Sequence, residues 1–142
     1  MNNVFRSIFF VMIFFQAGCN IEKVDEAKLL RVEVIAIHDE VMPLMGELKS
    51  LKKEVKLKTV NLLESDSSAN AEKIKELRDL ENQLDDAFEG MFVWMRQYKA
   101  PNESVSEEEA KAYLTQQKIL VEKVNKDIKE ALQAAKVELG KI

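Results

Sequence analysis

A seven-residue repeat of apolar side chains constrains this 142-residue chain more than any other feature of its sequence. Between residues 27 and 55 the apolar positions alternate in steps of three and four. They are Ala27, Leu30, Val34, Ile37, Val41, Leu44, Leu48, Leu51 and Val55. A heptad seam kept for four repeats predicts a long helix that packs against other helices. We expect this helix to run from Glu22 to about Leu63.

Two further seams of the same kind predict two further helices. The second seam, which Glu81 interrupts, comprises Ile74, Leu77, Leu84, Phe88, Met91, Met95 and Tyr98. The third comprises Ala110, Leu114, Gln117, Val121, Val124, Ile128, Ala131, Ala135 and Leu139.

Short polar or proline-containing segments separate the three helices. Residues 64–68 are turn-like and supply capping residues, and Pro101 ends the second helix. Ser106 and Glu109 have the spacing of a capping box that opens the third helix. Since short loops join antiparallel neighbours, the sequence predicts an all-α, antiparallel three-helix bundle with long coiled-coil-like helices. Pro43 lies inside the first seam, where proline costs about 3 kcal/mol, so we expect the first helix to be kinked or broken there.

The composition argues against several functional classes. The 25 acidic residues exceed the 21 basic ones, and an acidic chain without a basic arm does not suit nucleic-acid binding. One Cys and one His exclude a zinc cluster and leave few routes to a catalytic triad. The sequence has no Gly-rich phosphate loop, no nucleophile elbow and no pair of Glu-x-x-His motifs for a di-iron site. We therefore expect a protein that is not an enzyme.

The first 18 residues have the pattern of an export signal. Arg6 precedes an apolar stretch over residues 7–15, which spans about 14 Å as a helix, too short to cross a hydrocarbon core of about 30 Å. Gln16-Ala17-Gly18-Cys19 resembles the bacterial lipobox, with Gln16 at the position where Leu is usual. The resemblance implies cleavage before Cys19, a diacylglycerol thioether on Cys19 and an acylated N-terminus. Residues 19–142 then form one anchored domain.

These features predict a lipid-anchored protein of the cell envelope. Several acyl chains hold a protein stably on a membrane. Asn20 differs from the Asp that retains such proteins at the inner membrane in some bacteria, which favours the outer membrane, facing the periplasm. The alternative is a secreted protein with a free Cys19.

The chemically distinctive side chains gather at one height of the predicted bundle. Folding the first hairpin about residues 66–67 places His38 level with Met95 and Met42 level with Met91. The single His and single Trp of the chain lie there with all four methionines that follow the signal. The helix-disfavouring glycines Gly46 and Gly90 come at nearly the same height. Positions whose residues disfavour the local helix in this way are where functional sites are expected.

Thioether sulfur and imidazole are soft ligands that suit Cu(I) or Ag(I) and hardly suit Mg or Ca. The ligands we predict for Cu(I) are His38, Met42, Met91 and Met95, with Met45 as an alternate. A lid or pocket around the metal is predicted from Trp94, which offers a cation–π contact, together with Phe88 and Tyr113. The ligand set is similar in chemistry, though not in fold, to that of periplasmic copper–silver chaperones.

The same cluster also has interpretations that need no metal. Met fills irregular core gaps and contacts aromatic rings favourably, so the cluster can be plain packing. His38 then makes a polar contact with Asp39, Glu40 or Tyr113. A third alternative is a small apolar ligand in a pocket between helices. A bundle without metal would serve as a structural or partner-binding protein of the envelope.

The lysines near the end of the first helix allow two interpretations. Lys49, Lys52, Lys53, Lys56 and Lys58 suit the C-terminal end of a helix dipole and predict a solvated face. The alternative is a patch that docks a partner protein or a membrane surface. The heptad seams would also serve a homo-oligomer.

Two segments carry a family resemblance. Residues 38–46 (HDEVMPLMG) and 91–95 (MFVWM) resemble segments of small lipoproteins from Bacteroidota that are often labelled "viral A-type inclusion protein". The likeness extends to the lipoprotein signal and to Tyr113-Leu114-Thr115-Gln116-Gln117, and so covers most of the chain. The resemblance implies an exported, lipid-anchored helical protein. The label itself carries no mechanism.

Overall fold

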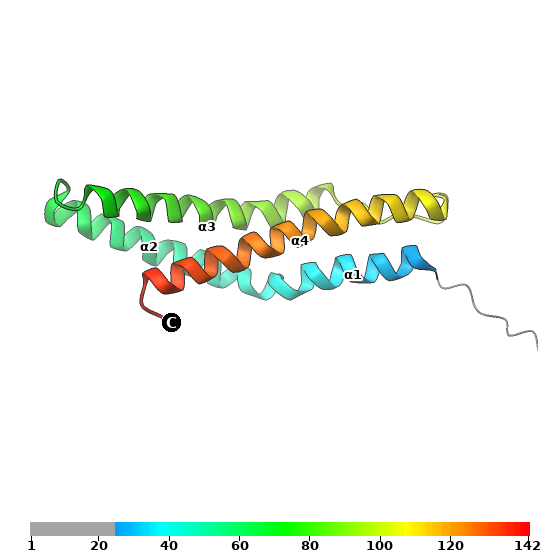
Figure 1. Ribbon diagram of the computed structural model, residues 1–142, viewed down its shortest axis with the longest axis horizontal. Helices are drawn as coiled ribbons and strands as arrows, with labels where there is room; N and C mark the ends of the chain where they lie inside the picture. The colour runs from blue at the N-terminus through cyan, green and yellow to red at the C-terminus, as the bar shows by residue number, and fades with distance from the viewer. Residues whose placement is uncertain (1–24) are drawn as a thin grey trace, which may run out of the picture.

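The computed structural model describes residues 25–142. The elements in chain order are α1 (Glu26–Val41), the 3₁₀ helix η1 (Met42–Leu44), α2 (Met45–Asp66), α3 (Ala71–Gln97) and α4 (Glu107–Glu138). Together α1, η1 and α2 form the first of three long rods, so the predicted three-helix bundle is confirmed (Figure 1). The predicted export signal, Cys19 and the predicted helix start at Glu22 lie outside the described residues.

The first rod changes helix type at Pro43, where a kink or break was predicted. Pro43 has no backbone N–H and cannot continue the α-helical hydrogen-bond ladder. The N–H of Met42 closes α1 by donating to the carbonyl of His38, and the N–H of Met45 donates to the carbonyl of Met42. The interruption is therefore a single tight turn between two α-helices.

Side-chain caps begin two of the helices. The carboxylate of Asp25 accepts the N–H of Lys28 at 2.9 Å at the start of α1. At the start of α4 the hydroxyl of Ser106 accepts the N–H of Glu109, and the carboxylate of Glu109 accepts the N–H of Ser106, each at 3.3 Å. The predicted capping box is thus confirmed.

The turn between the first two rods lies later than the sequence predicts. The expected turn covered residues 64–68, whereas α2 continues to Asp66 and the turn occupies residues 67–70. The carboxylate of Asp66 accepts the N–H groups of Ser68 and Ala69, both at 3.0 Å. Asp66 therefore closes the turn from its N-terminal side, and the polar residues before it remain helical.

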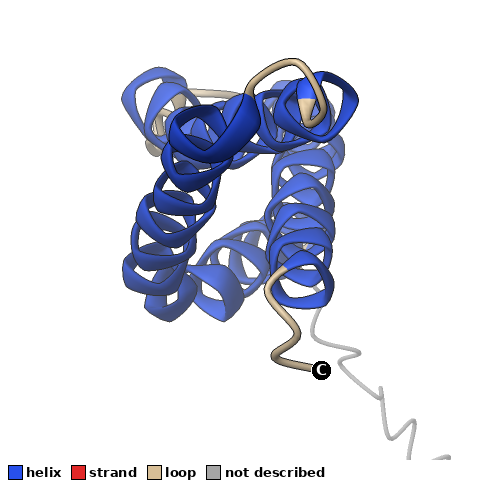
Figure 2. Ribbon diagram, turned by 90° about the vertical axis from the view of Figure 1, so that its left-hand side faces the viewer, coloured by secondary structure: helices blue, strands red, loops and turns tan. Residues whose placement is uncertain are grey.

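The three rods pack in an up-down-up arrangement (Figures 1 and 2). α4 runs antiparallel to α3 and parallel to the first rod. α1 packs chiefly against α4, while α2 packs against both α3 and α4. The break at η1 therefore divides the first rod into a part held by one neighbour and a part held by two.

An aliphatic core follows the predicted seams. Its fully buried members include Val34, Val41, Leu48, Val55, Leu77, Leu84, Met91, Val121 and Ile128. The second seam fails at Met95, which is 39% exposed, because the larger Trp94 beside it takes the buried position with 5% exposure. The interruption at Glu81 also has a structural explanation, since its carboxylate accepts the hydroxyl of buried Thr59 at 2.6 Å.

A ladder of ion pairs joins the first rod to α4. Five glutamates spaced seven residues apart each pair with a lysine: Glu26 with Lys111, Glu33 with Lys118, Glu40 with Lys129, Glu47 with Lys136 and Glu54 with Lys141. Buried Asn125 donates to the carbonyl of Ile37 at 3.0 Å and to the carboxylate of Glu40 at 2.8 Å. A buried Asn and flanking charge pairs set register in coiled coils, so this ladder holds α4 parallel to the first rod.

Candidate functional site

Four aromatic side chains cross the bundle beside the helix break. The ring centre of His38 on α1 lies 5.7 Å from that of Trp94 on α3. Trp94 stacks on Tyr98 at 5.0 Å, and Tyr98 stacks on Tyr113 of α4 at 6.3 Å. We call His38, Trp94, Tyr98 and Tyr113 the aromatic row. It links all three rods and brings together three residues that the sequence predicted for one site.

His38 is held by a neighbour in sequence. Its side chain is 17% exposed, and its Nδ1 lies 2.8 Å from the carboxylate of Asp39. Contact with Asp39 is one of the polar contacts that the sequence analysis gave for His38 in a site without metal. It occupies Nδ1 only, and within residues 25–142 Nε2 forms no hydrogen bond. Nε2 is therefore the nitrogen available to a ligand.

The four methionines divide into two environments. Met91 is fully buried and Met45 is 7% exposed, and both belong to the hydrophobic core. Met42 is half-buried, and Met95 is 39% exposed. Met42 follows His38 by one turn, and Met95 follows Trp94 directly, so the accessible sulfurs lie next to the His38–Trp94 contact along the chain.

Phe88 lies in a different place from the aromatic row. Its ring packs on Phe92 at 5.0 Å, and the ammonium group of Lys49 lies 5.4 Å from its centre. With Leu48 and Leu84 it lines a hollow of about 410 Å³ between α2 and α3. Phe88 does not lie beside His38, so the structure does not bring Phe88 into the predicted lid over a metal at His38.

Three buried polar atoms have no hydrogen-bond partner in the described part of the chain: Trp94 Nε1, the Tyr98 hydroxyl and Gln117 Oε1. Burial raises the pKa of the Tyr98 phenol, while nearby Arg31 acts in the opposite direction. An unpaired buried polar group costs about 1–3 kcal/mol. Two of the three atoms belong to the aromatic row, so this region is stabilised less well than the aliphatic core. The sequence predicted Tyr98 and Gln117 as members of the second and third seams, but it did not predict that their polar atoms lack partners, because hydrogen-bond pairing leaves no signal in a periodicity pattern.

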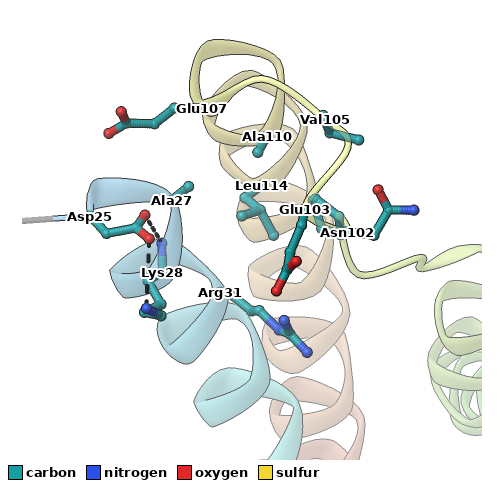
Figure 3. A pocket seen from close by; sticks show the side chains of 11 residues that line it. Asp25, Ala27, Lys28, Arg31, Asn102, Glu103, Val105, Glu107, Ala110 and Leu114 are labelled. Carbon is teal, nitrogen blue, oxygen red and sulfur yellow. Dashed lines mark hydrogen bonds and ion pairs between the residues drawn. The ribbon is translucent and has the colours of Figure 1, made fainter.

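A hollow of about 390 Å³ opens where the chain enters α1 (Figure 3). Lys28 and Arg31 line it from α1, Glu103 from the loop before α4, and Leu114 from α4. Figure 3 shows both Arg31 and Glu103 extending into this space. No member of the aromatic row lines it, so it is separate from the His38 site.

A longer groove of about 650 Å³ lies between α3 and α4. Its apolar floor consists of Ala87, Gly90, Val93, Trp94, Leu120 and Val124. Its charged rim consists of Asp79, Asp86, Asp127 and Glu130 together with Lys123. A Cβ atom added at Gly90 would meet no neighbouring atom within 4 Å. The groove is thus open above Gly90, and the charges lining it sum to −3.

Two general findings limit the chemistry of the described residues. Nowhere in residues 25–142 do three or more His, Cys, Asp or Glu side chains gather as a metal-holding group. None of the helices from α1 to α4 is long and apolar enough to cross a membrane.

No family model, curated protein or solved structure matches this chain. The resemblance to Bacteroidota lipoproteins stays a prediction, and function has to be argued from the residues.

Proposed function

We propose that this protein is a lipid-anchored, exported helical bundle that binds a soft metal ion such as Cu(I) at the break in its first rod. The contact between His38 and Trp94 carries the proposal. It joins the single imidazole and the single indole of the chain from two different helices, within one turn of two accessible methionine sulfurs.

The proposed donors are Nε2 of His38 and the thioethers of Met42 and Met95. Imidazole and thioether are soft donors that favour Cu(I) over hard cations. Methionine has three rotatable bonds, Met95 is 39% exposed, and Met42 is half-buried against the core, so each side chain keeps an exposed part that can turn toward the imidazole. Trp94 supplies an aromatic face for a cation–π contact. Thioethers also keep their metal-binding form in an oxidising compartment, where thiols are lost.

The proposed location follows from the predicted lipobox. Cys19 lies six residues before Asp25, a segment that reaches at most about 20 Å. A lipid on Cys19 therefore keeps the start of α1 near the membrane, with the bundle in the periplasm. Mass spectrometry of the membrane-extracted chain tests this part, since acylation at Cys19 adds the mass of the lipid.

The metal proposal is tested by titrating the full chain with Cu(I) against a chromogenic competing chelator. We expect one equivalent of Cu(I) bound more tightly than micromolar. Trp94 is the single tryptophan, so its fluorescence reports binding at this site and should be quenched in step with the titration. No competition with the chelator, or binding without a change in tryptophan fluorescence, would sink the proposal.

Matched variants separate the site from other sulfurs. His38→Ala and Met42→Leu should each weaken binding by about tenfold or more, equivalent to 1.4 kcal/mol. Met45→Leu is the packing control, because Met45 is in the core and Leu keeps its volume. Cys19→Ser removes the sulfur of Cys19, whether free or lipidated, and should leave the fluorescence response intact.

The core position of Met45 and Met91 favours a second candidate function, a metal-free bundle that binds a partner. In such a bundle the core methionines only fill space between the helices. An exported bundle of this kind would act through its surface, and a wild-type chain that fails the Cu(I) titration selects this candidate.

A further inference from the structure

Three exposed lysines of α2, which border the hollow between α2 and α3, differ from most lysines of the bundle. Twelve of the sixteen lysines in residues 25–142 form an ion pair with a carboxylate. Lys49, Lys53 and Lys56 are exposed and form none within that range. Leu57, 61% exposed, and Val60, 38% exposed, lie on the same face. We call these five residues the lysine ridge.

The groove between α3 and α4 carries charge of the opposite sign to that of the lysine ridge. The charges that line the groove sum to −3, and the ridge lysines sum to +3. Asp79, Asp127 and Glu130 pair with lysines of their own helices, so Asp86 is the one groove carboxylate without an ion pair in residues 25–142. The floor of the groove is apolar, with Val93 40% exposed and Leu120 41% exposed. The α3 residues that line it run from Asp79 to Gln97, about 27 Å of helix. The ridge covers about 17 Å of helix, so the groove is long enough to accept it.

The ridge and the groove lie at overlapping heights of the bundle. Lys49 lies over Phe88, and Lys52 forms an ion pair with Asp85. The lysines of the ridge are therefore level with α3 residues near 81–88, inside the part of α3 that lines the groove. The ridge is on α2, which contributes no residue to the groove. Two bundles that stand side by side in the same orientation can thus place the ridge of one against the groove of the next.

We infer that the groove between α3 and α4 binds the lysine ridge of a second copy of this chain. The contact is head-to-tail, because it joins two different surfaces and leaves one ridge and one groove open at the ends of a row. A symmetric groove-to-groove contact would bring two acidic rims together, which like-charge repulsion opposes. The inference does not depend on metal binding, since the ridge includes none of the proposed donors.

Sedimentation of the full chain in mild detergent tests the contact. We expect species larger than one copy at about 50 mM salt and a shift toward single copies at about 500 mM salt, because surface charge pairs are screened. Gly90→Leu fills the groove where the structure has space and replaces a helix-disfavouring glycine, so it should fold and lose the larger species. Lys53→Glu with Lys56→Glu reverses the ridge charge and should weaken association by about tenfold or more.

Mixing the two variants distinguishes a head-to-tail contact from other modes of association. The groove variant keeps a working ridge, and the ridge variant keeps a working groove. An equimolar mixture should therefore form pairs and nothing larger. Lys99→Glu, which changes an exposed and unpaired lysine away from the ridge, is the matched control and should associate like the wild type. Wild-type single copies at low salt, variants that associate normally, or a mixture that stays as single copies would each overturn the inference.

Discussion

The half of the bundle far from the start of α1 pairs its buried polar groups, whereas the half that contains the helix break leaves three unpaired. The distal half comprises α2, residues 71–86 and residues 126–138. There the Thr59 hydroxyl bonds to Glu81, and the Glu138 carboxylate bonds to both Lys58 and Lys73. The proximal half comprises α1, η1, residues 87–98 and residues 107–125. It holds all three unpaired atoms, on Trp94, Tyr98 and Gln117.

This difference follows from the side chains that fill the two halves. In the distal half, leucine and valine of the heptad seams interdigitate, and the few polar groups lie at the edge where lysines reach them. In the proximal half, Pro43 interrupts the first rod, and aromatic rings span the space between α1 and α3. Flat rings and flexible methionines can fill such space without matching every polar atom. The proximal half is therefore where a ligand can supply missing partners.

The largest expected effect is the loss of packing in the distal half. Leu77 is 1% exposed in the core, and Leu77→Ala should lower the free energy of unfolding by about 2–5 kcal/mol, because the cavity adds to the lost burial. Urea unfolding followed by circular dichroism measures it. Leu57→Ala is the matched control and should change stability by no more than about 0.5 kcal/mol, since Leu57 is 61% exposed. A cost below about 1 kcal/mol for Leu77→Ala would contradict a tightly packed distal half.

The polar bridge at Glu138 should have the next largest effect. Glu138→Gln weakens the contacts to Lys58 and Lys73, and we expect a loss of about 1–2 kcal/mol at neutral pH. The hydrogen bonds from Lys58 and Lys73 lower the pKa of Glu138 in the folded chain. Its contribution is therefore complete above the pKa of a glutamate in the unfolded chain and is lost as the pH falls through the lowered folded pKa.

Unfolding measured across acidic pH checks this linkage. The difference in stability between the wild type and Glu138→Gln should narrow steadily as the pH is lowered. A difference that stays constant from neutral to strongly acidic pH would show that the bridge contributes through packing and not through charge.

In the proximal half, removing an unpaired polar atom should cost little. Trp94→Phe keeps an aromatic ring in the row and deletes the buried N–H that has no partner in residues 25–142. The lost ring area and the relieved desolvation oppose each other, so we expect a change within about 1 kcal/mol. Thermal unfolding of Trp94→Phe and of Leu77→Ala under the same conditions compares the two losses of stability. A loss as large as that of Leu77→Ala would mean that both halves are packed equally well.

The smallest expected effect is on the ladder between the first rod and α4. Glu33 pairs with Lys118 at 2.7 Å, and the side chains are 51% and 35% exposed. Exposed pairs contribute little, so Glu33→Gln should lower stability by no more than about 0.5 kcal/mol, and high salt should abolish the difference. A clearly larger, salt-insensitive loss would show that the ladder stabilises the fold as well as setting register.

Local chemistry accounts for the features that could be predicted from the sequence. The three helices that the heptad seams predict, the capping box at Ser106 and the interruption at Pro43 depend on residues within a turn or two of each other, and all are confirmed. The proximity of His38 to Trp94 was also predictable, because two antiparallel helices joined by a short turn align residues by simple counting. The prediction stayed correct although the turn lies a few residues later than predicted, since large rings can meet across a small shift between the two helices.

Tertiary structure decided the features that depend on how each helix is rotated about its axis. The heptad pattern placed Met95 in the core, but the rotation of α3 buries Trp94 and exposes Met95. The same rotation separates buried Met91 from exposed Met95 and opens the groove beside Gly90. The sequence by itself therefore determined the three helices, the capped start of α4 and the break. Which side of each helix meets a neighbouring helix and which side stays exposed was decided by the competition of side chains for one shared core.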